Sequence, residues 1–126
     1  MDEHVLDASA ALAATFKEPG WPAVQQVGER LISSVNYAES ISTMTEKGYT
    51  VEDAVESLGF LAMWVVEFDE AQAIEAARLR PLTRGFGLSL GDRACLALAG
   101  LRGLPVLTAD RAWVEAAPHL AITCIR

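Results

Sequence analysis

The sequence predicts an α/β fold, in which a mostly parallel sheet of about five short strands is covered by helices on both faces. Short apolar runs alternate along the chain with longer helical stretches, as expected when helical crossovers join parallel strands. With 126 residues, 52% of them hydrophobic and 21% charged, the chain is large enough for one core but not for two. We therefore expect a single domain over residues 1–126.

The first half of the chain is expected to contain two strands and three helices. An apolar run at 4–6 ends at Asp7, and the turn Glu18-Pro19-Gly20 closes the helix that follows it. Gly48 is expected to stop the third helix. The predicted order is strand 4–6, helix 9–16, helix 22–30, strand 31–33 and helix 35–47.

The second half is expected to continue the alternation. Thr50 and Asp69 can each cap a helix, and Val65-Val66 favours a strand over 63–66. The second of these helices runs to about 82 despite Pro81 near its end, and residues 83–89 are expected to form a loop. A helix then resumes near Asp92 and ends at Gly103, before strands over 105–107 and 121–125.

Charge is distributed unevenly along the chain. The net charge of −7 disfavours a nucleic-acid binder, because contacts to phosphate supply most of the non-specific affinity. Residues 1–77, however, contain 14 acidic and three basic side chains, whereas residues 78–126 contain three acidic side chains and seven arginines. The second part can therefore present a basic face on an acidic molecule.

Several other classes of protein are disfavoured. No apolar run approaches the roughly 18 residues of a membrane-spanning helix, and the start lacks the character of a signal peptide, so we expect a cytoplasmic protein without a membrane partner. Cys95 and Cys124 lack CxxC spacing and are expected to be reduced thiols rather than zinc ligands. His4 and His119 have no pairing pattern that suggests triad catalysis.

Four acidic residues occupy positions where a parallel sheet collects its functional groups. Asp7 and Asp110 each follow a predicted strand, Glu39 lies in the first turns of a helix, and Asp92 begins another. Ligand sites in such sheets lie beyond the carboxyl ends of the strands, where the strand order reverses. All four side chains could converge there.

Such a cluster would need a cation. Neighbouring carboxylates repel one another and raise one another's pKa, which a hard divalent ion would relieve. Mg²⁺ and Mn²⁺ prefer oxygen ligands and activate water for phosphodiester hydrolysis. Each acid also has a plain alternative: Asp92 as a helix cap, Asp110 as a turn residue, Glu39 as a solvated helix position and Asp7 as a loop cap.

At these residues the chain resembles the PIN-domain ribonucleases, and specifically the VapC-type toxins of bacterial toxin–antitoxin modules. The resemblance spans nearly the whole chain and rests on VLDASAALA at 5–13, SSVNYAES at 33–40, LSLGDRACLALA at 88–99 and LPVLTADRAW at 104–113. It implies a three-layer α/β/α PIN-like fold, a Mg²⁺ or Mn²⁺ cofactor and endonucleolytic cleavage of RNA. It also implies a small antitoxin partner, and we expect a homodimer.

The resemblance also implies roles for individual residues. Asp7, Glu39, Asp92 and Asp110 match the acidic quartet of the family, with Asp7 and Asp92 as the main metal ligands. Ser9 and Thr108 match polar positions that line its site, where they would orient a carboxylate or act as local caps. Arg111 and Trp113 stand where some PIN nucleases have a further acid, so one metal ion is as well supported as two.

Arginines in the second part are candidates for contacts to phosphate, with solvated surface as the alternative. Arg93 and Arg111 adjoin acids of the quartet and are the preferred candidates; Arg84 comes next, and Arg78 and Arg80 could simply cap a helix. We expect Trp64 in the core and packing roles for Trp21 and Trp113, although exposed tryptophans can stack on RNA bases.

One helical region has more apolar surface than a core requires. Val51, Ala54, Val55, Leu58 and Phe60 follow one another at helical spacing or close to it. The excess could form a dimer or antitoxin interface, or the helices could simply complete the core.

Three other functions compete with a metal-dependent endoribonuclease. A PIN-like module could bind RNA or a protein without catalysis, but an intact acidic quartet disfavours this. A nuclease specific for DNA structures is disfavoured by the small size of the chain. An aspartate-based phosphotransfer or receiver domain is disfavoured because Ser9 stands where an aspartate would be needed, and neither Lys17 nor Lys47 follows a late strand.

Overall fold

The computed structural model describes residues 2–126 and is built on a five-stranded sheet in which every strand pair is parallel. The strand order is β3-β2-β1-β4-β5. The strands are β1 (Glu3–Leu6), β2 (Glu29–Ser33), β3 (Met63–Val66), β4 (Val106–Thr108) and β5 (Ile122–Cys124). The predicted α/β class, with about five short strands, is confirmed.

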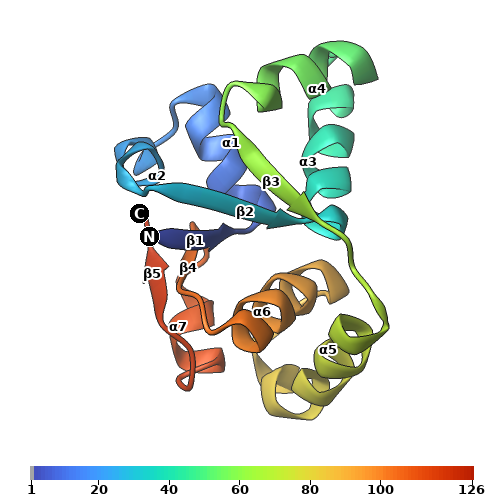
Figure 1. The fold of residues 1–126 in the computed structure, drawn as a ribbon, viewed down its shortest axis with the longest axis vertical. Coiled ribbons are helices and arrows are strands. Elements are labelled where there is room, and N and C mark those ends of the chain that lie inside the picture. The colour runs from blue at the N-terminus through green and yellow to red at the C-terminus, as the bar shows by residue number, and fades with distance from the viewer. Residues whose placement is uncertain (1) are drawn as a thin grey trace.

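Helices cover both faces of this sheet, which gives three layers (Figure 1). On one face lie α1 (Ala8–Phe16), α2 (Trp21–Gln26), α3 (Ser34–Glu46) and α4 (Val51–Gly59). On the other lie α5 (Glu70–Thr83), the 3₁₀ turn η1 (Arg84–Phe86), α6 (Leu90–Arg102) and α7 (Ala112–Ala116). The predicted helix stop at Gly103 is confirmed, since this residue adopts a left-handed φ of 65°.

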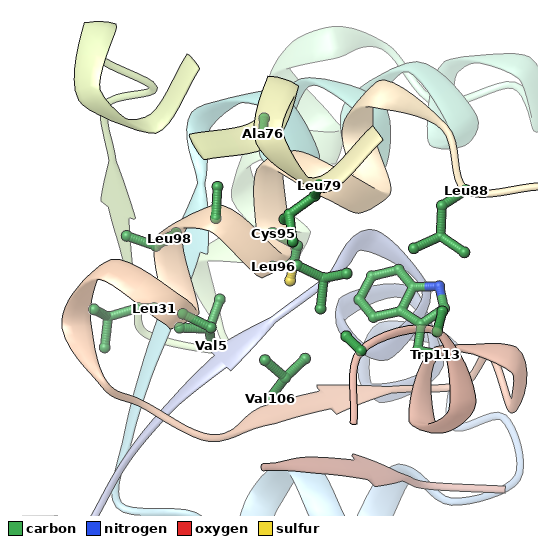
Figure 2. Packing of buried hydrophobic residues seen from close by; sticks show 14 residues of the cluster. Val5, Leu31, Ala76, Leu79, Leu88, Cys95, Leu96, Leu98, Val106 and Trp113 are labelled. Carbon is green, nitrogen blue, oxygen red and sulfur yellow. The ribbon is translucent and has the colours of Figure 1, made fainter. Parts of the chain in front are cut away.

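The core has one layer on each side of the sheet, because consecutive strand residues point to opposite faces. Val5, Leu31 and Val106 pack beneath α5, α6 and α7, whereas their neighbours Leu6, Ile32 and Leu107 pack beneath α1 and α2. Figure 2 shows the first of these layers, with the buried Trp113 ring beside Leu88 and Leu96. The packing role expected for Trp113 is confirmed.

Three expectations from the sequence differ from the structure. The helix expected over 22–30 ends at Gln26, because Glu29 and Arg30 already pair with β1 at the start of β2. The short helix α7 and the turn η1 were not predicted from the sequence. Trp64, expected in the core, is 66% exposed, because β3 lies at the edge of the sheet.

Two further expectations concern the cysteines and membrane-spanning helices. Cys95 and Cys124 are free thiols, the first buried and the second partly so. In residues 2–126, none of the helices combines the length and the apolar character needed to span a membrane.

Candidate active site

The strand order places the candidate site at the centre of the sheet. The chain proceeds from β1 outward to β2 and β3, and then returns to the other side of β1 for β4 and β5. The order therefore reverses between β1 and β4, which is where parallel sheets of this kind bind ligands. Asp7 directly follows β1, Thr108 ends β4, and the Asp7 amide donates to the Leu107 carbonyl at 3.3 Å.

Asp7 is a buried carboxylate held by three neighbours. The Ser9 hydroxyl lies 2.7 and 2.8 Å from its two oxygens, the Thr108 hydroxyl donates to Oδ2 at 2.8 Å, and the Ala10 amide donates to Oδ1 at 2.9 Å. The last bond also makes Asp7 the N-cap of α1. The side chain is thus oriented by residues that are a hundred positions apart in sequence.

The hydroxyls of Ser9 and Thr108 also organise the loop after β4. Ser9 Oγ accepts the Ala109 amide at 2.9 Å, and Thr108 Oγ1 accepts the Asp110 amide at 3.0 Å. Each hydroxyl therefore joins a backbone N–H to the Asp7 carboxylate. The two roles considered for these residues, local capping and orientation of a carboxylate, are both present.

Burial raises the pKa of the Asp7 carboxyl from 3.8 to about 6. The hydrogen bonds from Ala10, Ser9 and Thr108 oppose this rise, and the nearby charge of Asp92 adds to it. The ionised form of Asp7 is therefore disfavoured, chiefly because burial excludes water from the carboxylate. A cation beside it would lower its pKa again.

Glu39 reaches the same region from α3, next to the first turn of α6. Asn36, one turn earlier and 1% exposed, donates through Nδ2 to Glu39 Oε1 and to the Gly91 carbonyl, both at 2.9 Å. The Glu39 carboxylate lies so close to Gly91 that a Cβ at that position would overlap it. A Cβ at 91 would therefore displace this carboxylate, which ends a flexible side chain, from its present position.

Asp92 follows Gly91 and is partly buried in the first turn of α6. Ser89 and Asp92 form a capping box: the Asp92 amide donates to Ser89 Oγ at 3.1 Å, and the Ser89 amide donates to Asp92 Oδ2 at 2.9 Å. The helix-cap alternative is therefore present alongside the position near Asp7. The second carboxylate oxygen has no such bond to the cap.

The buried Cys95 thiol lies within reach of the charges of three of the acids. Its pKa is raised far above 9.0, first by burial and then by the charges of Asp7, Asp92 and Glu39. Cys95 lies one turn beyond Asp92 in α6. The thiol stays protonated and offers no nucleophile.

Asp110 is placed differently from the other three acids. Its side chain is exposed, and its Oδ1 accepts the Ala112 amide at 3.0 Å at the start of α7, as in the turn-residue alternative. Only its backbone amide, through Thr108, connects it directly to the Asp7 group. A catalytic role for Asp110 stays a prediction.

Two arginines were expected to contact substrate. Arg93 is partly buried, and its Nη1 donates to the Ala76 carbonyl of α5 at 2.9 Å, so this guanidinium joins two helices. Arg111 is exposed at the start of α7, beside Asp110. Of the two, Arg111 has the freer side chain.

Asn36 and Gly91 were absent from the candidates identified in the sequence. The spacing of Asn36 and Glu39, three residues apart on a helix, was the available signal for the first. For Gly91 the only signal was its position before Asp92. Both matter because α3 and α6 approach each other, which spacing within one helix does not reveal.

The donor set suits a hard divalent cation, although its geometry is not preformed. In the part of the chain that the structure describes, no three His, Cys, Asp or Glu side chains are close enough to ligate one ion. Asp92 and Glu39 instead hydrogen-bond to Ser89 and Asn36. The Oδ1 atom of Asn36 is buried without a partner beside Glu39. Carboxylate and amide oxygens of this kind are the donors that Mg²⁺ and Mn²⁺ prefer.

Fold and site together define an α/β domain with an acidic centre at the carboxyl edge of a parallel sheet. A model of the PIN domain matches residues 4–118, which is most of the chain. The chain therefore belongs to the PIN-domain family. No curated protein matches its sequence.

Solved structures share this fold. A toxin–antitoxin complex from Klebsiella pneumoniae contains a similar chain with a TM-score of 0.75 and 13% identity, over 98% of both chains. A chain of the DNA-bound VapBC of Salmonella typhimurium has a TM-score of 0.71 and 23% identity, over 100% of both chains. A chain of VapBC-5 from Mycobacterium tuberculosis has a TM-score of 0.67 and 23% identity, over 100% of this chain and 99% of that one. These likenesses establish a common fold.

Proposed function

We propose that this protein is a Mg²⁺- or Mn²⁺-dependent endoribonuclease that acts as the toxin of a type II toxin–antitoxin system in the cytoplasm. The observation that carries the proposal is the buried Asp7 carboxylate at the switch point of the sheet, held by Ser9 and Thr108 and lying near the negative charge of Asp92. Membership of the PIN-domain family supports nuclease chemistry at this place. Similarity to the toxin–antitoxin and VapBC structures supports the toxin role.

In this proposal the chain's own residues hold and orient the ion. Asp7 and Asp92 are the main ligands, Glu39 is a third, and Asp110 joins from the loop after β4. Ser9 and Thr108 keep the Asp7 carboxylate facing the site, and Asn36 does the same for Glu39. The bound ion would supply a water of lowered pKa and offset the charge that develops on the phosphate.

Arg111 is the proposed phosphate contact at the rim, because its guanidinium is exposed next to Asp110 and stays charged at any working pH. Arg93 is retained only as a weaker candidate, since its hydrogen bond to Ala76 holds it against α5. One metal ion is sufficient for this chemistry, and a second would need a further ligand at the position that Arg111 occupies.

RNA cleavage by the purified protein tests the proposal. Wild type with Mg²⁺ is compared with wild type plus a chelator, with Asp7→Asn, and with Asp53→Asn, a matched change at an exposed residue of α4. We expect cleavage only in wild type with Mg²⁺ and in Asp53→Asn. Equal RNA loss in all four would contradict a metal nuclease. A DNA strand of the same sequence, cut equally well, would favour the DNA-directed alternative.

Binding of the ion needs a readout other than cleavage. Mg²⁺ or Mn²⁺ alone should raise the melting temperature of wild type and of Asp53→Asn, but not that of Asp7→Asn or Asp92→Asn. An equal rise in all four would place the ion elsewhere. No rise in wild type, with RNA bound but uncut, would favour a non-catalytic binding module.

The proposed antitoxin and the proposed homodimer need an interface. On α4 and the residue after it, Val51, Val55 and Phe60 are 52%, 41% and 84% exposed, whereas Ala54 and Leu58 are buried against α3. The buried members complete the core, and the exposed members form an apolar surface, which we call the α4 surface. Such surfaces mark protein interfaces.

A further inference from the structure

A groove of about 540 Å³ lies away from the acidic centre, on the α5 and α6 side of the sheet. Its lining includes Glu3 and Glu29 at the starts of β1 and β2, Trp64 on β3, Glu67 after β3, Gln72 on α5 and Arg102 at the end of α6. Nothing in the proposed nuclease uses these residues. The groove is large enough for one or two long side chains.

The lining carries more negative charge than its own cation balances. The groove is lined by one guanidinium, that of Arg102, and by the four carboxylates of Glu3, Glu29, Glu67 and Asp69. Glu3 and Glu29 are paired in register on adjacent strands. Like charges that face each other across a strand pair are unfavourable. In residues 2–126, the ion pairs include neither these two glutamates nor Arg102. The groove therefore favours a cation and disfavours RNA phosphate.

An unpartnered acceptor and an exposed aromatic ring occur in the same lining. Gln72 is only 6% exposed; its Nε2 donates to the Glu67 carbonyl at 2.9 Å, and its Oε1 has no partner. Trp64 is 66% exposed and lines the same groove. A guanidinium matches this set, because it donates to carboxylates and amide oxygens and stacks on an indole ring.

The edge of the sheet adds a way to hold an extended chain. β3 pairs only with β2, and no strand in the described residues pairs with its other side. An extended peptide adds to such an edge through its backbone and places alternate side chains on one face. Trp64 and Val66 are two residues apart on β3 and both line the groove, so a peptide paired there would present every second residue to it.

We propose that this groove binds an extended segment of a partner protein, which pairs with the free edge of β3 and places alternating arginine or lysine side chains among Glu29, Trp64 and Glu67. The net negative lining argues against a second copy of this chain, because two such grooves would repel each other. The inference is independent of whether the acidic centre cleaves RNA.

Peptide binding tests the groove directly. The probe is a fluorescein-labelled peptide of roughly seven residues, long enough to span a strand, that alternates arginine with threonine. A peptide with glutamate in place of arginine is the charge control. Anisotropy should show binding of the arginine peptide only, weakened by salt. The Glu29→Gln/Glu67→Gln variant should weaken it about tenfold, as expected from two partly exposed charge pairs.

Matched variants separate the groove from other acidic surfaces. Glu52→Gln/Glu56→Gln removes two exposed carboxylates from α4, and Asp92→Asn removes one from the acidic centre; both should bind the peptide as wild type does. Trp64→Ala should weaken binding, and since its ring is exposed the variant should stay folded, which circular dichroism checks. In proton–nitrogen spectra of wild type, the Trp64 indole and the β3 amides should shift on binding.

Five outcomes would overturn the proposal. These are equal binding of the glutamate peptide, equal weakening by the α4 variant, loss of binding in Asp92→Asn, and wild-type self-association that Trp64→Ala abolishes. The fifth is no peptide binding at all. In that case the carboxylates only protect the edge strand from unwanted pairing.

Discussion

At the scale of single residues, Asp7 gives the site its pH dependence. Because its pKa is raised from 3.8 to about 6, the folded state binds this proton more tightly than the unfolded chain does. The stability that this contributes is present below pH 4 and is lost as the pH rises from about 4 to 6. Its full size is roughly 3 kcal/mol.

We therefore predict that Asp7→Asn stabilises the metal-free protein at pH 7.5. Wild type should unfold at lower urea in chelator at pH 7.5 than at pH 5, and the difference should shrink in Asp7→Asn because the amide does not ionise. Asp53→Asn, exposed on α4, should keep the wild-type difference. A fall in stability at both pH values on Asp7→Asn would mean that the hydrogen bonds of Asp7 outweigh its burial.

Gly91 is a second residue whose role follows from a single contact. Gly91→Ala should gain less than the roughly 1 kcal/mol that alanine normally adds within a helix, because the new methyl group displaces the Glu39 carboxylate from its hydrogen bond with Asn36. In a Glu39→Ala background the same change should be neutral or stabilising by up to about 1 kcal/mol, since alanine is the better helix former. Chemical denaturation of the four proteins forms a double-mutant cycle.

Gly100→Ala provides the control within the same helix. A Cβ there meets only Leu120 Cδ2, at an ordinary 3.6 Å. We expect this variant to be at least as stable as wild type. If Gly91→Ala gains as much stability as Gly100→Ala, the Glu39 carboxylate does not occupy the space beside Gly91 in solution.

At the scale of elements, the capping box of α6 has a structural role that is distinct from the proposed metal site. Ser89→Ala should cost about 1 kcal/mol of stability, because the Asp92 amide loses its acceptor. It should leave the rise in melting temperature with Mg²⁺ intact. Asp92→Asn should lose that rise. Thermal melts of both variants with and without the ion make the comparison.

The α4 surface gives a prediction about association. Phe60→Ser should leave the melting temperature nearly unchanged, since this ring is 84% exposed, but should convert a homodimer to monomer in sedimentation velocity. Leu58→Ser, two residues earlier and buried, is the contrasting variant, because it should unfold the helix pair instead. A dimer that persists in Phe60→Ser would assign the dimer interface to another surface.

Most elements were predictable from the sequence because each has a local signal. The apolar pairs Val5-Leu6, Leu31-Ile32 and Val106-Leu107 identify strands that are buried on both faces, and capping residues mark the helices that follow. Glu29 and Arg30 misled the prediction, since polar residues at the start of a strand extend a helical pattern. The prediction that Trp64 is buried was wrong. β3 lies at the edge of the sheet, and its place there depends on the strand order, which no local sequence pattern indicates.

The site was predictable in part for the same reason. Asp7, Glu39 and Asp92 occupy positions at the carboxyl edge of a parallel sheet, and the negative charge of each raises the pKa of Cys95. Asp110 also follows a strand, yet its exposed side chain accepts the Ala112 amide in the turn before α7, a helix too short to have a clear pattern. Asn36 and Gly91 depend on how two helices pack, and that becomes visible only in the folded molecule.

At the scale of the whole molecule, uneven charge should govern how the proposed RNA substrate binds. In an Asp7→Asn background, which prevents cleavage, RNA affinity should fall with rising salt despite the net charge of −7. Arg111→Ala should weaken binding and reduce the salt slope by about 1. Arg78→Ala is the control, because this exposed arginine already lies 3.7 Å from Glu75. Equal effects of the two variants would remove Arg111 from the proposed interface.

The hydrogen bond from Thr108 to Asp7 joins residues 101 positions apart, and this has a consequence during synthesis. A growing chain on the ribosome carries Asp7 from the start, but the hydroxyl that orients it arrives only when β4 has been made and has left the exit tunnel. Until then β4 has not paired with β1, and the carboxylates of residues 7, 39 and 92 are not yet held in fixed positions by one folded sheet. The acidic centre is therefore a late product of translation, and nascent fragments that end before β4 should contain its residues without containing the site.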